Sequence, residues 1–256
     1  MRAFLFVVSL WAAACAARAE EAGAAAAPSP FADWSVAIVA ADWRATNGRP
    51  TEAFDNARRD LVEAFVAAGF ARDGVAQFSL KPRQAGDDPN VYVDPSEAIR
   101  RYLDHARARP GGCLFYVTTH GTPQGIVFGG PNLPPRGLAR LMTDACGDRP
   151  TIVVVSACFS GVFVPALAAD NRMVMTAARP DRSSFGCSET DRYPYFDACV
   201  LESLPLVDNF LALGRRVKTC VAERERAANL TPPSEPQTAT GAQMLALLPM
   251  MPFQRR

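Results

Sequence analysis

The stretch 151–161, TIVVVSACFSG, decides how this chain folds. It opens with a run of β-branched apolar residues, which is typical of a short strand buried on both faces of a sheet. The small residues Ser156 and Ala157 end the run, so Cys158 follows the carboxyl end of the strand directly. Such a strand predicts a parallel sheet with helices on both of its faces.

A second strand of the same type, 113–119 (CLFYVTT), lies upstream and is followed by His120 and Gly121. Between the two strands, 138–145 has helical spacing, and a strand–helix–strand unit implies parallel neighbours with a right-handed crossover. The carboxyl ends of parallel strands meet at one edge of the sheet, where open α/β sheets hold their ligands. We therefore expect Cys158 and His120 to lie together, as a nucleophile and its base.

Composition excludes several classes of function. The chain has 256 residues, of which 27 are basic and 26 acidic, so no charge excess points to nucleic acid. The two histidines, His105 and His120, and the lack of a CxxC pair predict no metal site, and we expect no organic cofactor. His105 stands among arginines in a helical stretch, which favours a solvated helix face.

The first residues resemble an export signal. Arg2 precedes the apolar run 3–17, and Ala-Arg-Ala at 17–19 is a small-x-small cleavage site. We expect a signal peptide over 1–19, a periplasmic or secreted protein, and no membrane span after cleavage. An uncleaved anchor, or a lipid-anchored envelope form acylated at Cys15, is the alternative. The Ala- and Pro-rich segment 20–31 is predicted to be a flexible linker.

Export permits disulfides, but spacing alone does not give their pairing. If Cys158 stays a free thiol, at least one further cysteine must be unpaired. After cleavage the cysteines would be Cys113, Cys146, Cys158, Cys187, Cys199 and Cys220.

Further strands and helices alternate along the chain, which predicts one doubly wound α/β domain over 32–226. A short helix over 162–169 would place Cys158 just before a helix amino terminus, which favours a thiolate. The segment 227–256, rich in Pro, Thr and Ser, is predicted to be a partly disordered tail with an apolar patch at 244–253 that docks on the body. The other expected strands are 34–41, 75–80 and 172–178, and the other helices are one capped by Thr51, then 96–109, 195–204 and 210–228.

Three segments in this order carry a family resemblance: LFYVTTHG ending at Gly121, VVVSACFSG ending at Gly161, and MTAARPDRSSFGC ending at Cys187. With them, the chain over 34–204 resembles the legumain-like (asparaginyl) cysteine endopeptidases of the caspase-like group, in their short exported bacterial form. The resemblance implies a three-layer sandwich with a mostly parallel central sheet.

The resemblance also implies roles for individual residues. Cys158 would be the nucleophile and His120 the general base and acid, while the backbone N–H groups of Gly121 and Cys158 would bind the oxyanion. Ser183 and Ser184 would line the edge on which an extended peptide lies. Arg44 would line the specificity pocket, with Arg58 and Arg59 as the alternatives.

These roles predict an exported cysteine endopeptidase that cleaves peptides or proteins through a thioester acyl-enzyme, after Asn or Asp if the family preference holds. Interception of the acyl-enzyme by an amine would give transpeptidation instead. Two positions depart from the pattern, since Ser156 and Phe159 stand where the animal and plant enzymes carry acidic residues. The departures motivate an alternative, a catalytically inactive caspase-like binding or scaffold protein of the cell envelope.

Overall fold

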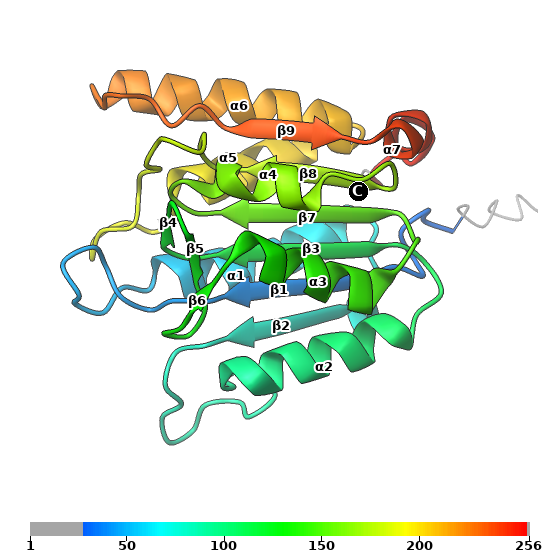
Figure 1. Cartoon of the computed structure of the whole chain (residues 1–256), viewed down its shortest axis with the longest axis horizontal. Coiled ribbons are helices and arrows are strands. Elements are labelled where there is room, and N and C mark those ends of the chain that lie inside the picture. The colour runs from blue at the N-terminus through cyan, green and yellow to red at the C-terminus, as the bar shows by residue number, and fades with distance from the viewer. Residues whose placement is uncertain (1–27, 255–256) are drawn as a thin grey trace, which may run out of the picture.

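The computed structural model describes residues 28–254, so the expected signal peptide and Cys15 lie outside the described residues. A six-stranded sheet in the order β2-β1-β3-β7-β8-β9 forms the centre (Figure 1). Neighbouring strands pair in parallel except β9, which runs antiparallel to β8. The strands are β1 (Ser35–Ala40), β2 (Val75–Ser79), β3 (Cys113–Thr118), β7 (Thr151–Ser156), β8 (Arg172–Thr176) and β9 (Gln237–Thr240).

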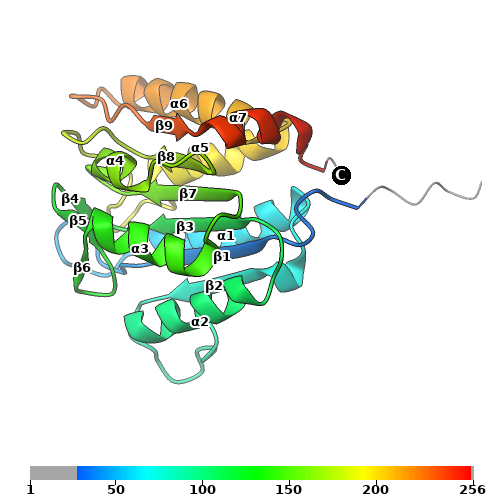
Figure 2. The ribbon, with the colours of Figure 1, turned by 45° about the vertical axis from the view of Figure 1, so that its right-hand side comes forward.

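Helices cover both faces of this sheet, which confirms the predicted three-layer α/β architecture (Figure 2). One face carries α1 (Ala53–Ala67), α5 (Tyr195–Ser203) and α6 (Phe210–Ala227), and the other carries α2 (Pro95–Arg107), α3 (Pro135–Cys146) and the four-residue α4 (Val164–Leu167). A three-stranded sheet follows β3, and it consists of β4 (Gly121–Thr122), β5 (Gly125–Val127) and β6 (Asn132–Leu133).

The central strands β1, β3, β7 and β8 are buried throughout because both of their faces are covered. In β3, Leu114 and Tyr116 join the core beneath α1, α5 and α6, whereas Phe115 and Val117 join the core beneath α2 and α3. Successive side chains of a strand point to opposite faces, so a doubly covered strand buries every residue. The helix that Asp94 opens also forms as predicted, since its carboxylate accepts a hydrogen bond from the N–H of Glu97 at 2.9 Å.

The prediction of a partly disordered tail over 227–256 is wrong for the described residues. Gln237–Thr240 forms β9 and pairs with β8, and α7 (Ala242–Leu247) follows it. The predicted docking of the apolar patch is confirmed, because Met244, Leu248 and Phe253 are buried in the core beside α6. The composition of 231–241 is that of disorder, but pairing to a neighbouring strand and burial of the patch offset the entropy of ordering it.

The linker predicted over 20–31 ends earlier than expected. Phe31 is fully buried, with its ring stacked on Phe70 at 4.5 Å and lying 5.7 Å from that of Phe253. Both described ends of the chain meet at Gly69, where a Cβ would lie 2.5 Å from Ser29 Oγ and 3.1 Å from Gln254 Cγ. This meeting point follows α1, at the end of the sheet opposite the carboxyl ends of the parallel strands.

Two disulfides tie helices into the body. Cys113–Cys146 joins β3 to α3, and Cys199–Cys220 joins α5 to α6. Cys158 and Cys187 are the free cysteines of the described chain, so the expectation of a second unpaired cysteine is confirmed. Within residues 28–254, no helix has the length and apolar character needed to cross a membrane.

Candidate active site

The pairing of β3 with β7 brings the two predicted catalytic residues to one edge of the sheet. The strands are parallel with Thr118 opposite Ser156, and the N–H of Thr119 donates to the carbonyl of Ser156 at 3.0 Å. His120 and Cys158 each follow two residues after this pair, so both leave the sheet at the same edge. The predicted parallel arrangement of the two strands is confirmed.

Gly121 lies directly against the backbone of Cys158. A Cβ at this position would be 2.0 Å from the carbonyl oxygen of Cys158 and 3.0 Å from the Cβ of Ala157. Only glycine permits so close an approach of the two chain segments. The N–H of Cys158 donates no hydrogen bond to any partner within residues 28–254. It therefore remains available to a ligand, as an oxyanion donor requires.

Two contacts fix the half-buried imidazole of His120. Its Nε2 lies 2.7 Å from the carbonyl oxygen of Arg44. A carbonyl oxygen only accepts, so Nε2 carries the proton and Nδ1 keeps the lone pair of a base. Phe54, at the start of α1, meets the ring edge-on at 5.1 Å and 83°. The ring is thus held with one nitrogen bound and the other free to take a proton.

The sulfur of Cys158 contacts the loop that follows β8. Sγ accepts a hydrogen bond from the N–H of Ser184 at 3.2 Å, and the thiol lies 3.4 Å from the carbonyl oxygen of the same residue. No hydrogen bond joins Cys158 to His120 in the described part of the chain. The single short helix expected over 162–169 is replaced by a 3₁₀ turn, Ser160–Phe163, and by the four-residue α4. The donor at the sulfur is therefore a loop N–H rather than a helix terminus.

Of the three candidate specificity arginines, Arg44 is the one beside the catalytic edge. Its guanidinium makes two hydrogen bonds to Asp42, at 2.8 and 3.2 Å, and stands 4.8 Å from the ring centre of Trp43. The hydrogen bond with Asp42 raises the pKa of Arg44 above its ordinary value. The pair stabilises the loop whose carbonyl oxygen holds His120, and 40% of the Arg44 side chain stays exposed.

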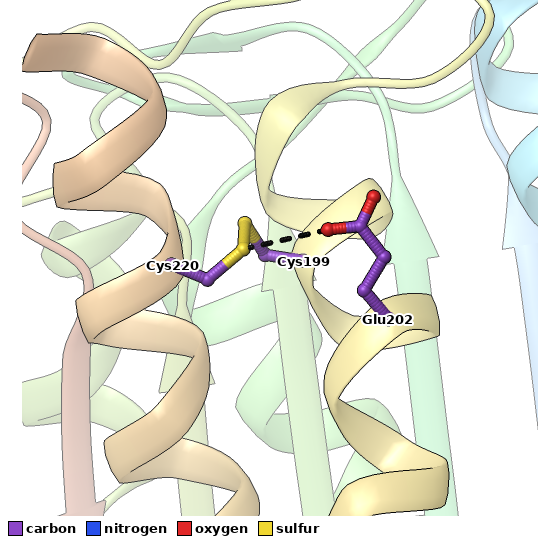
Figure 3. Close-up of side chains that lie close together, drawn as sticks. All are labelled: Cys199, Glu202 and Cys220. Carbon is purple, nitrogen blue, oxygen red and sulfur yellow. Dashed lines mark hydrogen bonds between the residues drawn. A yellow bond between two sulfur atoms is a disulfide. The ribbon is translucent and has the colours of Figure 1, made fainter. Parts of the chain in front are cut away.

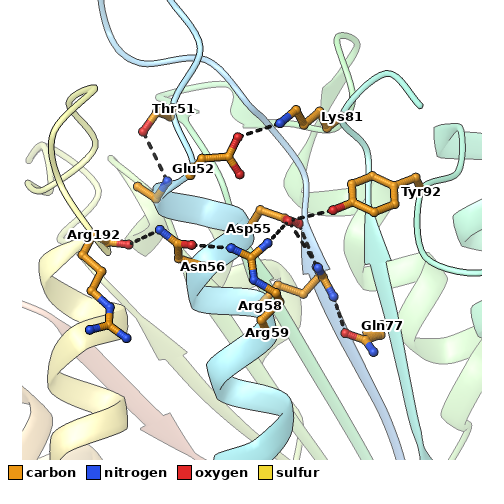
Figure 4. A network of polar contacts seen from close by, with 11 residues as sticks. Thr51, Glu52, Asp55, Asn56, Arg58, Arg59, Gln77, Lys81, Tyr92 and Arg192 are labelled. Carbon is orange, nitrogen blue, oxygen red and sulfur yellow. Dashed lines mark hydrogen bonds and ion pairs between the residues drawn. The ribbon is translucent and has the colours of Figure 1, made fainter. Parts of the chain in front are cut away.

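Arg58 and Arg59 belong to a structural network along α1 (Figure 4). Arg58 is buried, donates to Asp55 at 2.8 Å and also contacts Gln77. Arg59 donates to the second oxygen of Asp55 at 2.6 Å. Burial alone would raise the pKa of Asp55, but the hydrogen bonds and charges of both arginines outweigh it and hold the pKa below its ordinary value. Both guanidinium groups are therefore engaged by the fold.

The loop after β8 places Ser183 and Ser184 differently. Ser183 is exposed, and the half-buried Ser184 contacts the sulfur of Cys158. Farther along the loop, the carbonyl of Ser188 accepts from the hydroxyl of Thr51 at 2.9 Å. The loop that carries Arg44 thus contacts His120, and the loop that carries the two serines contacts Cys158.

Sequence reasoning missed Asp197, a fully buried residue of α5. Its carboxyl accepts hydrogen bonds from Tyr116 at 2.6 Å and from Thr118 at 2.5 Å, both in β3. The available signal was one acidic residue in the otherwise apolar start of a helix, YFDACV. A single carboxyl of this kind is costly to bury, so its presence indicates specific partners.

A second cluster, away from this edge, consists of Cys199, Cys220 and Glu202 (Figure 3). Atoms that could bind a metal ion lie within 4.8 Å of one another there. The two sulfurs are joined in a disulfide, however, and so offer no thiolate ligand. We interpret the cluster as a cross-link between α5 and α6.

Comparison with known proteins agrees with this geometry. Residues 111–206, which include His120 and Cys158, match the model of the peptidase C13 family. The crystal structure of caspase-1 from Spodoptera frugiperda is similar, with a TM-score of 0.60 and 16% sequence identity over 82% of this chain and 87% of that chain. No curated protein matches the chain. The structural likeness shows a caspase-like fold. The family match confirms the legumain-like resemblance and supports a cysteine peptidase.

Proposed function

We propose that this chain is an exported cysteine endopeptidase in which Cys158 and His120 act as a catalytic dyad. The observation that carries the proposal is the parallel register of β3 and β7, Thr118 opposite Ser156, which delivers both residues to one edge. Gly121 brings a second backbone segment against Cys158 at the same place. The match to the peptidase C13 family over this region supports the same chemistry.

The reaction follows from these positions. Nδ1 of His120 takes the thiol proton, and the sulfur of Cys158 attacks the carbonyl carbon of the peptide bond. The N–H groups of Gly121 and Cys158 stabilise the oxyanion, and each such donor is worth about 2.7–4 kcal/mol. As the C–N bond breaks, His120 returns its proton to the departing amine and a thioester remains. Water, deprotonated by His120, then hydrolyses the thioester and releases the carboxylic acid and the thiol.

Backbone contacts hold both members of the dyad in the resting site. The N–H of Ser184 donates to the sulfur of Cys158 and would stabilise the negative charge that forms there when the thiol loses its proton. The carbonyl of Arg44 accepts from Nε2 of His120, an interaction that strengthens when the ring is protonated. One backbone contact thus supports the sulfur of Cys158, and the other supports the imidazole of His120.

The same loops would bind the substrate. An extended peptide can pair with the exposed backbone around Ser183, whose neighbour Ser184 already touches the nucleophile. The partly exposed guanidinium of Arg44 can donate to the carboxamide of Asn or the carboxylate of Asp at the residue before the cleaved bond. This placement supports a preference for those two residues.

The two disulfides support export, because cytosolic proteins rarely keep such bonds. Their support is independent of the sequence signal at 1–19. Fractionation of cells, with mass measurement of the mature amino terminus, tests the address and distinguishes a cleaved form from one acylated at Cys15.

A peptide-library digest of the mature protein tests the activity. We expect cleavage after one or two residue types, read by mass spectrometry, and its loss in Cys158→Ala and His120→Ala. Cys187→Ala is the matched control, since Cys187 is the other free cysteine of the described chain. Burial raises the pKa of its thiol to about 12, so its removal should leave turnover intact. Cleavage that persists in Cys158→Ala would refute the proposal.

Alkylation separates the peptidase from the inactive scaffold. An activated Cys158 reacts with iodoacetamide well below pH about 8.5, the range of an ordinary thiol. Ordinary reactivity together with no cleavage would favour the scaffold. An added amine that appears at the new carboxyl end of the product would identify transpeptidation.

A further inference from the structure

A buried carboxyl group lies beneath the catalytic edge, on the face of the sheet that α5 covers. Asp197 has no exposed surface, and its carboxyl accepts hydrogen bonds from Tyr116 at 2.6 Å and Thr118 at 2.5 Å. The hydroxyl of Ser156, the last residue of β7, also acts to lower the pKa of this carboxyl. One carboxyl group from α5 therefore binds two side chains of β3 and lies near the end of β7.

The partners of Asp197 stand at the last positions of the two strands. Thr118 and Ser156 are opposite each other in the β3–β7 register, and they are the final residues of their strands. The backbone of each strand continues for two residues to reach His120 or Cys158. The carboxyl group thus lies where the two strands make their last pairing, before each chain segment leaves the ladder.

An acidic side chain buried without a cationic partner needs an explanation other than packing. No Lys, Arg or His forms an ion pair with Asp197 in residues 28–254, and the groups facing it are the hydroxyls of Tyr116, Thr118 and Ser156. Burial raises its pKa to about 6, although the hydroxyls act in the opposite direction. An apolar residue of similar size would fill the space without a desolvation penalty, so packing does not explain a carboxyl group here.

We propose that Asp197 is a positioning residue, whose carboxylate holds the ends of β3 and β7 together and thereby sets the relative position of His120 and Cys158. The proposal rests on the proposed function, because the position matters only if these two residues react together. A displacement of about 1 Å at reacting atoms can cost about 100-fold in rate. A contact two residues from both members of a dyad is well placed to prevent such a displacement.

Asp197→Asn tests the role, because it keeps the shape and removes the charge. At pH 7 we expect its kcat to fall by about 10- to 100-fold with little change in KM, since no substrate touches the residue. Thr118→Val keeps Asp197 but removes one hydroxyl that donates to it, so it should also lower kcat. Ser203→Ala is the control, since Ser203 is a buried hydroxyl on the same helix, and it should leave kcat unchanged.

The pH dependence gives a readout that a purely structural role would not produce. The ratio of wild-type to Asp197→Asn kcat removes any pH effect that both proteins share. Because the pKa of Asp197 is raised to about 6, the wild-type residue is largely neutral at pH 5 and resembles Asn there. We expect the ratio to fall toward one between pH 7 and pH 5.

Alkylation of Cys158 by iodoacetamide, followed by mass spectrometry, gives a test that needs no substrate. The Asp197→Asn rate at pH 7 should fall toward that of His120→Ala, and Ser203→Ala should match the wild type. If the wild type cleaves no peptide, the proposed function fails while this measurement still decides the role of Asp197. A wild-type rate in Asp197→Asn, or an equal loss in Ser203→Ala, would overturn the inference. If Asp197→Asn does not fold, Thr118→Val decides by the same criterion.

Discussion

Replacing Gly121 by alanine should remove most of the activity while leaving the fold intact. The added Cβ would lie 2.0 Å from the carbonyl oxygen of Cys158. Carbon and oxygen atoms that are not bonded do not approach within 3.0 Å, so the two backbone segments must separate by about 1 Å. The displacement moves Gly121, the proposed oxyanion donor, and its neighbour His120, the proposed base, at the same time.

The size of the effect follows from this separation. A misplacement of about 1 Å can cost about 100-fold in rate, which corresponds to about 2.7 kcal/mol of transition-state stabilisation. We therefore expect kcat to fall by about two orders of magnitude, with a smaller change in KM. The rate of Cys158 alkylation should also fall, because the base moves relative to the thiol.

The assay compares turnover of one library-selected peptide by wild type and Gly121→Ala, with circular dichroism to confirm folding. Gly137→Ala is the matched control. Gly137 lies in the first turn of α3. The nearest atom to a Cβ added there would be the end of the flexible Leu133 side chain, at 3.0 Å. The control should keep full activity. A folded Gly121→Ala protein with wild-type kcat would show that the close approach of Gly121 to Cys158 has no catalytic role.

Three further predictions concern stability and specificity. The folded-state pKa of Asp197, about 6, exceeds the ordinary 3.8 by about two units, so its contribution to stability falls by about 3 kcal/mol as pH rises from about 4 to 6; urea unfolding of Asp197→Asn should lack this dependence, and an unchanged dependence would contradict it. Replacing both Cys199 and Cys220 by alanine opens a 21-residue loop and should cost about 3 kcal/mol with activity retained at 25 °C; a loss well below 1 kcal/mol in denaturant titrations would count against this prediction. Arg58→Ala should lower the free energy of unfolding by about 3–5 kcal/mol, because it leaves buried Asp55 without its main partner. Arg44→Ala should raise KM and lower the free energy of unfolding by under about 1 kcal/mol. Equal effects of the two variants on KM would contradict the assignment of Arg44 to the specificity pocket.

The sequence predicted the sheet and its catalytic edge because those features have local signals. The strands holding Cys158 and His120 are apolar on both faces, and the residues that end them are small or polar. A helix between two such strands fixes their relative direction, so the meeting of the two residues needs no knowledge of long-range contacts. The alternation of strands and helices predicted a doubly wound α/β domain for the same reason, and the family resemblance implied its caspase-like form.

The features that sequence reasoning missed all depend on tertiary contacts. The residues of β9, QTAT, have no strand pattern, and only pairing with β8 makes them a strand. Asp197 is one acidic residue on a helix until its partners on β3 are known. The sequence alone gives no reason to prefer Arg44 or Arg58 as the specificity residue. Only the structure shows that Arg58 is buried and bound to Asp55. The contact between Ser184 and Cys158 likewise joins residues 26 positions apart.

The meeting of the two described chain ends at Gly69 has a practical consequence for handling this protein. Ser29 and Gln254 touch the same glycine, at the opposite end of the sheet from His120 and Cys158. A solid support, an affinity label or a fused domain attached near either residue would therefore lie on the side of the molecule away from His120 and Cys158. Whichever attachment is chosen, the edge that carries His120 and Cys158 would point away from it.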